Sequence, residues 1–353
     1  MRERRRLEHR HRQRLLRWLQ FSDQTWDSFG GEQYAPAADQ AIREQQIHIA
    51  ERAAPGPIGW ELGSPTCREP RRGHVGAAHL EGERSLTGGG SAYWQAWLPE
   101  GDARAVVVIV HGLGEHSGRY HHVGRRLAGA GFAAYAADHR GHGRSGGRRA
   151  NIGRMAVVVG DLAGFVRFAA ERCPGVRVFM LGHSLGGLIA LQYATGDVPE
   201  LAGLVLTGPL VQVESGSPVL ERMAGVLSAL APNLGVLMVP PDAVSRDPAV
   251  VAAYRADPLV HHGKVPARTG AEILATTRAL PARLPRLRIP LLLIHGTCDR
   301  LAPAAGSQLV HDGVASPDRT LRLCDGLWHE VMNEPERDEI LDEIVGWISD
   351  RIG

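Results

Sequence analysis

Short apolar runs separated by helical stretches and glycine-rich turns dominate the chain from about residue 82 onward. The runs are continuously apolar rather than alternating, which is typical of strands in a parallel sheet that is covered on both faces. Alternation of such strands with helices predicts a doubly wound α/β domain, whose ligand site lies beyond the carboxyl ends of the strands. The predicted strands are Ala105–Val110, Phe132–Ala137, Val176–Leu181, Leu204–Leu206 and Pro290–Ile294, and the predicted helices include Val123–Ala130, Val157–Glu171 and Leu185–Ala194.

The first 80 residues differ in composition from the rest of the chain. They are rich in Arg, Gln, Pro and Gly, and residues 1–20 alone contain eight arginines and two glutamates. Such a segment buries too little apolar surface to offset its ordering entropy, so we predict a basic, disordered extension over residues 1–80. Two alternatives stay open: the arginine cluster binds nucleic acid or anionic lipid, or translation starts further downstream. The α/β domain is then expected to span residues 81–353.

Charge, cysteine pattern and hydropathy argue against several classes of protein. A formal net charge of +2 is too small for a dedicated nucleic-acid binder, so no nucleic-acid partner is expected. The four cysteines show neither CxxC pairing nor ligand-like spacing with histidine, so we expect isolated reduced thiols and no metal site. No apolar run approaches the ~18 residues that span a bilayer, and no apolar segment follows the basic N-terminus as in a signal peptide. A cytoplasmic protein is therefore expected.

The segment Gly182–Gly187, with the sequence GHSLGG, directly follows a predicted strand and opens a predicted helix. This is the context that a G-x-S-x-G nucleophile elbow requires, with Ser184 as the nucleophile. Glycine at positions 182 and 186 removes side chains that would clash in the sharp turn. The N-terminus of the helix also directs its unpaired N–H groups toward the reaction centre.

A second segment, Gly143–Gly147 with the sequence GRSGG, matches the same pattern. It lies several residues beyond its strand and has no abrupt strand-to-helix turn around Ser145. We therefore interpret Ser145 as part of a structural loop and keep Ser184 as the candidate nucleophile.

A serine hydroxyl needs a base that takes its proton and a carboxylate that orients the base. In hydrolases with this elbow the acid and then the histidine follow the serine along the chain. Asp299 lies just past a buried strand, and His329 lies between the strand-like run Thr320–Cys324 and the last predicted helix, Asp338–Ile352. They are the best candidates for the acid and the base. Weaker candidates for the base are His261, His262 and His295.

An oxyanion hole requires two backbone N–H groups directed at the developing negative charge. The residue after the nucleophile, Leu185, supplies one of them. The other is expected from Leu113 in the turn His111–Gly114, which directly follows the strand Ala105–Val110. The alternative interpretation of this turn is a simple cap of the strand.

Five segments, in the same order along the chain, resemble the monoacylglycerol lipases, especially the bacterial ones. The resemblance covers about residues 80–353 and has no counterpart for residues 1–80. The segments are His111–Tyr120 (HGLGEHSGRY), Asp138–Ser145 (DHRGHGRS), Gly182–Gly187 (GHSLGG), Tyr254–Val260 (YRADPLV) and Trp328–Pro335 (WHEVMNEP).

The resemblance implies an α/β-hydrolase fold, with a mostly parallel central sheet, helices on both faces and a helical cap insertion. It also implies hydrolysis of monoglycerides to glycerol and free fatty acid with no cofactor. Animal members carry a second histidine at the position of Met332, so the polar end of the site differs here. By position, the resemblance assigns Ser184, Asp299 and His329 to the triad, Leu113 and Leu185 to the oxyanion donors, and Glu115, Arg119 and Tyr254 to the surroundings of the glycerol.

Residues 210–275 form an insertion to which no sheet strand is assigned. Its segment Pro218–Pro240 is apolar over much of its length but is interrupted by Pro232 and Gly235, too often to span a membrane. One interpretation is a helix packed on the core. The resemblance implies instead a lid that lines an acyl tunnel and contacts lipid in the headgroup plane, and hence peripheral membrane association.

Three classes of function are compatible with these residues. The first is a monoacylglycerol lipase that forms an acyl-enzyme on Ser184. The second is a broader carboxylesterase or lysophospholipase that uses the same triad. The third is a non-catalytic ligand-binding protein on a hydrolase scaffold, and the complete triad argues against it.

Overall fold

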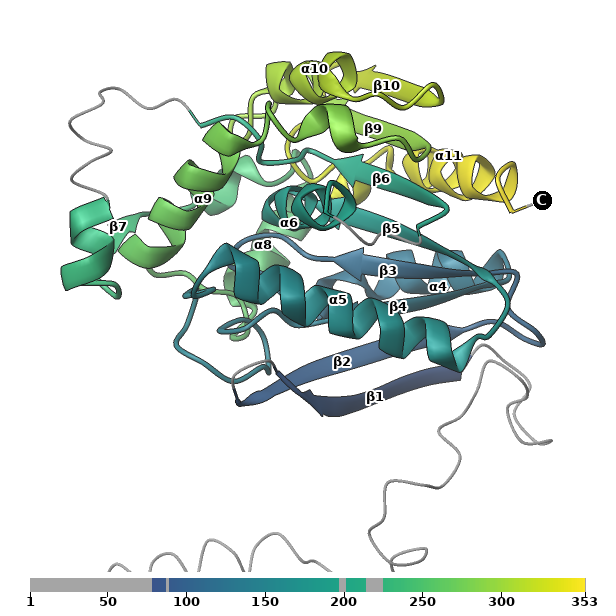
Figure 1. Ribbon diagram of the computed structural model, residues 1–353, viewed down its shortest axis with the longest axis horizontal. Coiled ribbons are helices and arrows are strands. Elements are labelled where there is room, and N and C mark those ends of the chain that lie inside the picture. The colour runs from purple at the N-terminus through teal and green to yellow at the C-terminus, as the bar shows by residue number, and fades with distance from the viewer. Residues whose placement is uncertain (1–77, 87–88, 197–200, 214–224, 353) are drawn as a thin grey trace, which may run out of the picture. The chain divides into compact units, whose positions relative to one another are not determined.

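The central element of the computed structural model is an eight-stranded, mostly parallel sheet (Figure 1). The structure describes residues 78–86, 89–196, 201–213 and 225–352, all within the second of two units, Pro65–Gly353. The strands pair in the order β1-β2-β4-β3-β5-β6-β9-β10, and β2 runs antiparallel to both of its neighbours. Their bounds are β1 (Ala78–Ser85), β2 (Ser91–Leu98), β3 (Ala105–Val110), β4 (Phe132–Ala137), β5 (Arg177–His183), β6 (Gly203–Thr207), β9 (Leu291–Gly296) and β10 (Arg319–Cys324).

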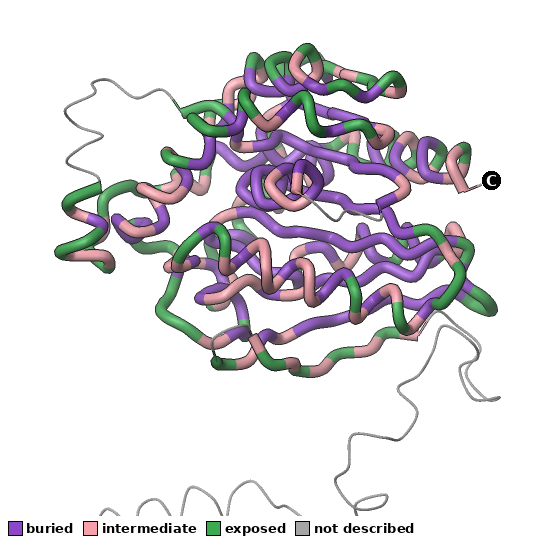
Figure 2. The backbone as a smooth tube through the Cα atoms, viewed as in Figure 1, coloured by how far each residue is buried: buried purple, intermediate pink, exposed green. Residues whose placement is uncertain are grey.

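The inner strands are buried on both faces, as their continuous apolar sequences predict (Figure 2). Along β3, Val106, Val108 and Val110 belong to the core on the side of α5 and α6, whereas Val107 and Ile109 belong to the core on the side of α4 and α11. Two cores therefore hold the sheet between layers of helices. The helices are α4 (His121–Gly129), α5 (Met155–Arg172), α6 (Leu185–Ala194), α10 (Ala304–Gly313) and α11 (Arg337–Ser349).

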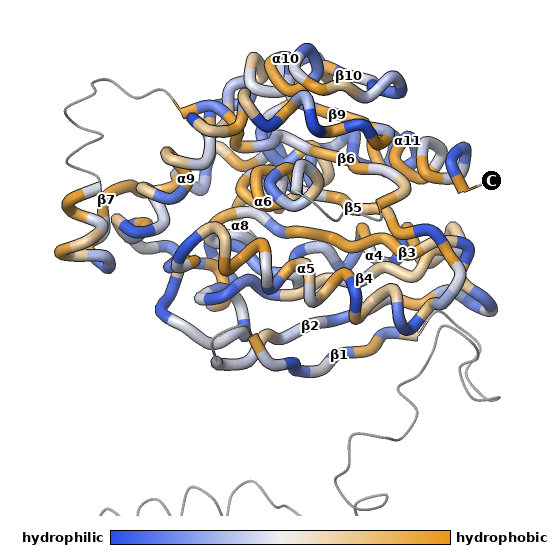
Figure 3. The backbone as a smooth tube through the Cα atoms, viewed as in Figure 1, coloured by the Kyte–Doolittle hydropathy of each residue, from blue (hydrophilic) through white to orange (hydrophobic). Residues whose placement is uncertain are grey.

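The segment between β6 and β9, which we call the cap, contributes no strand to the central sheet among its described residues, 208–213 and 225–290. Its two short strands, β7 (Gly235–Leu237) and β8 (Val265–Pro266), pair only with each other in the described part of the chain. Its helices are α8 (Pro248–Ala256) and α9 (Ala267–Ala279). Figure 3 shows a hydrophobic stretch of chain around β7, at the outer edge of the cap.

The structure covers the predicted N-terminal extension only in part. Residues 1–77 lie outside the described residues, while Ala78–Leu80 begin β1.

Two further expectations concern the cysteines and membrane spans. Within the described residues Cys298 and Cys324 are free, but Cys173 is disulfide-bonded, so the expectation of isolated thiols is wrong at this position. Among the described helices, none combines the length and the apolar character needed to cross a bilayer.

Candidate active site

Ser184 lies at a sharp turn between β5, which ends at His183, and α6, which begins at Leu185. Its backbone has φ 53° and ψ −120°, a conformation that side-chain-bearing residues rarely adopt and that marks a nucleophile elbow. The turn is tightly packed: a Cβ atom on Gly182 would lie 2.9 Å from the Cα of Gly187, and one on Gly186 would lie 2.0 Å from the carbonyl oxygen of Val110. The two glycines are therefore required, as the sequence pattern predicts.

Ser145, in the second G-x-S-x-G match, has a different environment. Its hydroxyl donates a hydrogen bond to the carbonyl oxygen of Asp138 (2.6 Å) and accepts one from the N–H of Tyr93 (2.9 Å). The first bond closes the loop after β4 on itself and the second attaches it to β2, so Ser145 has a structural role.

The predicted base and acid are in direct contact. Nδ1 of His329 donates to Oδ2 of Asp299 at 2.7 Å, and both side chains are almost fully buried. This bond fixes the imidazole tautomer in which Nε2 is the nitrogen that can take a proton. His329 and Ser184, which lie 145 residues apart in sequence, line the same cavity of about 280 Å³.

Asp299 is held from several sides. Its Oδ2 also accepts a bond from Nε2 of His295 (3.0 Å), and its Oδ1 accepts bonds from the N–H groups of Leu301 (2.7 Å) and Ala302 (3.0 Å). Burial alone would raise the pKa of Asp299, but the bonds from His295 and His329 outweigh it and hold that pKa far below its usual range. The carboxylate is therefore ionised at neutral pH.

The charge of Asp299 acts in turn on His329. Burial lowers the pKa of the imidazole, but the hydrogen bond and negative charge of Asp299, with smaller contributions from Glu330 and Glu115, raise it above its ordinary value. His295, a weaker candidate for the base from sequence, is instead a second partner of the acid, and its other ring nitrogen bonds to the hydroxyl of Ser307 (2.7 Å). Chain order argues against His295 as the base, because it precedes Asp299, but nothing in the sequence predicts its bond to the acid.

The two predicted oxyanion donors flank Ser184. Leu185 opens α6, so its N–H group has no carbonyl partner within the helix. Leu113 lies in the turn after β3, which we call the oxyanion loop (His111–Glu115), and it lines the cavity beside Ser184. The loop is tight, because a Cβ on Gly112 would lie 3.2 Å from the Cβ of Ser184.

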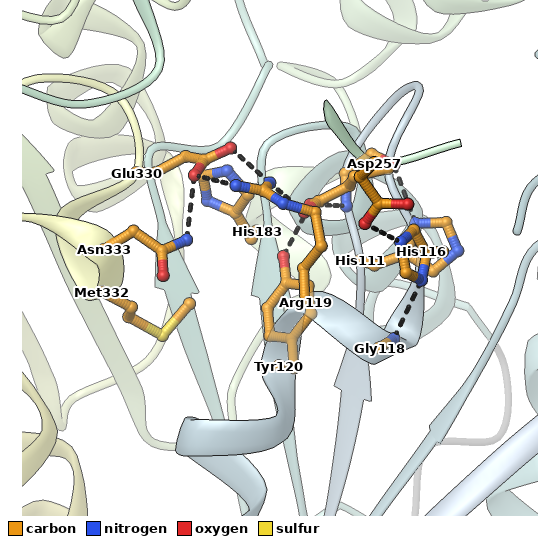
Figure 4. Close-up of polar contacts among 12 residues, drawn as sticks. His111, His116, Gly118, Arg119, Tyr120, His183, Asp257, Glu330, Met332 and Asn333 are labelled. Atoms are coloured by element: carbon orange, nitrogen blue, oxygen red, sulfur yellow. Dashed lines mark hydrogen bonds and ion pairs between the residues drawn. The ribbon is translucent and has the colours of Figure 1, made fainter. Parts of the chain in front are cut away.

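The structure places the three residues predicted around the glycerol in two settings. Glu115 and Tyr254 line the cavity, whereas Arg119 lies behind them, with its guanidinium 4.7 Å above the Tyr254 ring. The side chain of Arg119 bonds to both Glu115 and Glu330 (Figure 4). Glu330, directly after His329, also lines the cavity, and sequence reasoning missed it.

Met332, at the position where the resemblance implies a second histidine in animal members, is 3% exposed and packs in the core on the side of α4 and α11. Its carbonyl oxygen accepts a bond from Nε2 of His122 (2.8 Å). Met332 is not among the residues that line the described cavity, so the polar side chains of its lining belong to other residues.

Three buried histidines, His111 at the start of the oxyanion loop and His139 and His142 in the loop after β4, pack against one another. Nδ1 of His111 donates to the carbonyl oxygen of Gly112 (2.8 Å) while its Nε2 accepts from the N–H of His139 (2.9 Å), so His111 is neutral. Burial lowers the pKa of His139 to about 4 and, with the neighbouring His139, that of His142 to about 3. Through His111, the first residue of the oxyanion loop, this cluster ties that loop to the loop after β4.

The cavity is lined by both apolar and polar side chains. Most of the apolar ones come from the cap. The apolar residues are Leu113, Leu210, Leu237, Met238, Val239, Pro240, Val244 and Leu301, and the polar ones are Glu115, His183, Ser184, Tyr254, Arg300, His329 and Glu330.

The fold and the site define a serine hydrolase of the α/β-hydrolase class. A family model described as serine aminopeptidase, S33, matches residues 101–336. The chain is 47% identical over 275 residues to a monoacylglycerol lipase of Mycolicibacterium smegmatis, a match that covers 78% of this chain and 98% of the relative. It thus belongs to the S33 family and, within it, to the branch of the monoacylglycerol lipases.

Two further comparisons agree with this assignment. A monoglyceride lipase of Homo sapiens is 36% identical over 259 residues, which cover 72% of this chain and 86% of that protein. The crystal structure of a monoacylglycerol lipase from Paleococcus ferrophilus superposes with a TM-score of 0.65 at 30% identity, over 78% of this chain and all of the other.

A second family model, described as a transglycosylase-like domain, matches residues 17–61, which lie outside the described residues.

Proposed function

We propose that this chain hydrolyses monoacylglycerols to glycerol and free fatty acid through an acyl-enzyme on Ser184. The observation that carries the proposal is the bonded pair of His329 and Asp299 on the same cavity as a serine in the elbow conformation. An apolar lining from the cap suits an acyl chain, and the polar groups around Ser184 suit a small alcohol.

The reaction follows from these positions. Nε2 of His329 takes the proton of Ser184 as its oxygen attacks the ester carbonyl, and the N–H groups of Leu113 and Leu185 bind the oxyanion that forms. The protonated imidazole, stabilised by Asp299, then gives its proton to the departing glycerol oxygen. Water, deprotonated by the same nitrogen, attacks the acyl-enzyme, and the fatty acid leaves as Ser184 recovers its proton.

One observation favours a second candidate, hydrolysis of lysophospholipids. Arg300 lines the cavity next to Asp299, with its guanidinium 4.1 Å above the ring of Trp328, and a cation there suits a substrate phosphate. Rates on 1-oleoylglycerol, trioleoylglycerol, oleoyl-lysophosphatidylcholine and a short p-nitrophenyl ester separate the candidates. The proposal expects the highest kcat/KM on 1-oleoylglycerol. A higher value on the lysophospholipid would replace it with the second candidate.

We further propose that the cap contacts the membrane surface from which the substrate comes. Large apolar side chains are exposed along one continuous stretch of the cap, which we call the cap patch. Leu230 is 81% exposed and Leu234 is 53% exposed. Single exposed leucines are normal on a protein surface, but a continuous group of them marks an interaction surface. The members of the cap patch are Val226, Leu230, Leu234, Val236, Leu237 and Met238.

Replacing Leu230 and Leu234 by serine is expected to weaken binding to phosphatidylcholine vesicles by about tenfold or more. Burial of one leucine contributes roughly 1.5–3 kcal/mol, and every 1.4 kcal/mol is a factor of ten. Vesicle co-sedimentation measures the loss, and the rate on a soluble short-chain ester should stay unchanged. Leu323→Ser, at a similarly exposed position on β10, is the matched control. Equal binding by the double variant and the control would contradict membrane contact through the cap patch.

A further inference from the structure

The guanidinium of Arg119 is bound between two carboxylates. It donates to both oxygens of Glu330, Oε1 at 2.6 Å and Oε2 at 2.7 Å, and also to Oε2 of Glu115 at 2.8 Å (Figure 4). The side chain of Arg119 is 9% exposed, and those of Glu115 and Glu330 are 4% and 5% exposed. A buried bidentate pair of this kind fixes the orientation of both side chains relative to each other, which a single surface ion pair does not.

Each carboxylate is attached to a loop of the active site. Oε1 of Glu115 accepts the N–H of Gly112 at 2.6 Å, directly before Leu113, and the hydroxyl of Tyr120 at 2.7 Å. Glu330 is covalently next to His329, and its Oε2 also accepts a bond from the amide of Asn333 at 2.8 Å. Arg119 therefore connects the loop of a predicted oxyanion donor to the loop of the predicted base.

The sheet alone does not join these two loops. The oxyanion loop follows β3 and the loop of His329 follows β10, and the strands β5, β6 and β9 lie between them in the sheet. The bond from Arg119 to Glu330 spans this separation directly, across 211 residues of sequence. A tie between the loops holds Leu113 and His329 at a fixed spacing on either side of Ser184.

We propose that Arg119 and Glu330 are positioning residues that keep the oxyanion donor and the base of this hydrolase in a fixed relative position. The proposal rests on the proposed function and deepens it. It differs from the role implied by the family resemblance, because the guanidinium is engaged by two carboxylates rather than directed at the alcohol. A lysine at position 119 could neutralise one carboxylate but could not form the fork.

The same network places an excess negative charge near the imidazole. Two carboxylates and one guanidinium leave one negative charge, and Arg119 holds the pKa of Glu330 well below its usual range against the effect of burial. The titratable groups around His329 are Asp299, Glu330, Glu115 and His183. Removing the charge of Glu330 should lower the pKa of His329, whereas removing that of Arg119 should raise it.

The test compares Glu330→Gln, Arg119→Met and Arg119→Lys in the full chain, with 1-oleoylglycerol as substrate. We expect kcat/KM to fall by about 100-fold in the first two, mostly through kcat, because small misplacements of reacting groups are that costly. The acid limb of kcat/KM against pH, which reports the base in the free enzyme, should move to lower pH in Glu330→Gln and to higher pH in Arg119→Met. Arg119→Lys should recover part of the rate.

The exposed pair of Arg126 and Asp342 supplies matched controls, Arg126→Met and Asp342→Asn, which should change kcat/KM by less than about twofold. The proposal would be overturned if the loss of kcat/KM in these variants only paralleled their loss of melting temperature and their pH profiles did not move. If Arg119→Met does not fold, Glu330→Gln and Arg119→Lys still decide. Full activity of Ser184→Ala would instead refute the proposed function itself, so the two failures are distinguishable.

Discussion

Replacing Ser184 by alanine is expected to lower kcat by about a millionfold on every ester the protein hydrolyses. The oxyanion donors and the cavity stay in place in this variant, but no atom remains that can form the acyl-enzyme. The side chain is small and 8% exposed, and alanine removes only its oxygen, so the fold should be kept. Steady-state rates and labelling by a fluorophosphonate probe, which reacts with activated serines, measure the effect.

Ser145→Ala is the matched control, because Ser145 lies in the same sequence pattern and is equally buried. This variant loses the bonds to Asp138 and Tyr93, which should cost about 1–3 kcal/mol of stability. It should nevertheless label at the wild-type rate. Labelling that survives Ser184→Ala, or disappears in a folded Ser145→Ala protein, would show that the nucleophile is misassigned.

Asp299→Asn is expected to reduce kcat by about 10⁴-fold while the fold is retained. Oδ2 of Asp299 accepts bonds from His329 and His295, whereas Oδ1 accepts bonds from two backbone N–H groups, and an amide can present its oxygen to only one of these two sides. Where the amide donates to Nδ1 of His329, the proton moves to Nε2, and the imidazole can no longer accept the proton of Ser184. The variant also loses the negative charge that stabilises the imidazolium.

The control for this variant is Asp325→Asn, in an exposed turn after β10, where the carboxylate bonds only to the hydroxyl of Thr297 within the described residues. It should leave kcat within about twofold of the wild-type value. Single-turnover measurements of acylation with a p-nitrophenyl ester separate the chemical step from product release. An acylation rate in Asp299→Asn within tenfold of wild type would assign the acid to another residue.

The sheet and the elbow were predictable because both depend on local sequence. Continuous apolar runs mark the inner strands, and Gly182 and Gly186 mark a turn in which a Cβ has no room. Asp299 and His329 could be found because the loops that hold them follow strands, which places them at one edge of the sheet.

The antiparallel edge of the sheet was not predicted. Along β1, exposed residues alternate with half-buried ones, and its sequence AHLEGERS has only two apolar residues, so it resembles a loop. Its pairing with β2 is decided by tertiary contacts, as is common for edge strands. The predicted extension over residues 1–80 thus includes the first three residues of a strand.

The network around Arg119 lies beyond sequence reasoning for a different reason. Its members come from loops 211 residues apart, and nothing in the pattern around Glu330 specifies a partner. The family resemblance singled out Glu115 and Arg119, but as residues that surround the glycerol of the substrate. Their bonds to each other and to backbone atoms emerge only when the loops are folded together.

The cluster of His111, His139 and His142 makes the stability of the fold depend on pH. In the unfolded chain these imidazoles take up protons near pH 6.5, whereas in the fold His139 does so only near pH 4 and His142 near pH 3. Their contribution to stability is therefore complete above about pH 6.5 and is lost progressively as the medium is acidified toward pH 4, at a cost of roughly 3 kcal/mol for His139 alone. Acidification is therefore expected to lower the free energy of unfolding through these histidines before it neutralises Asp299, whose pKa is held far below its usual range.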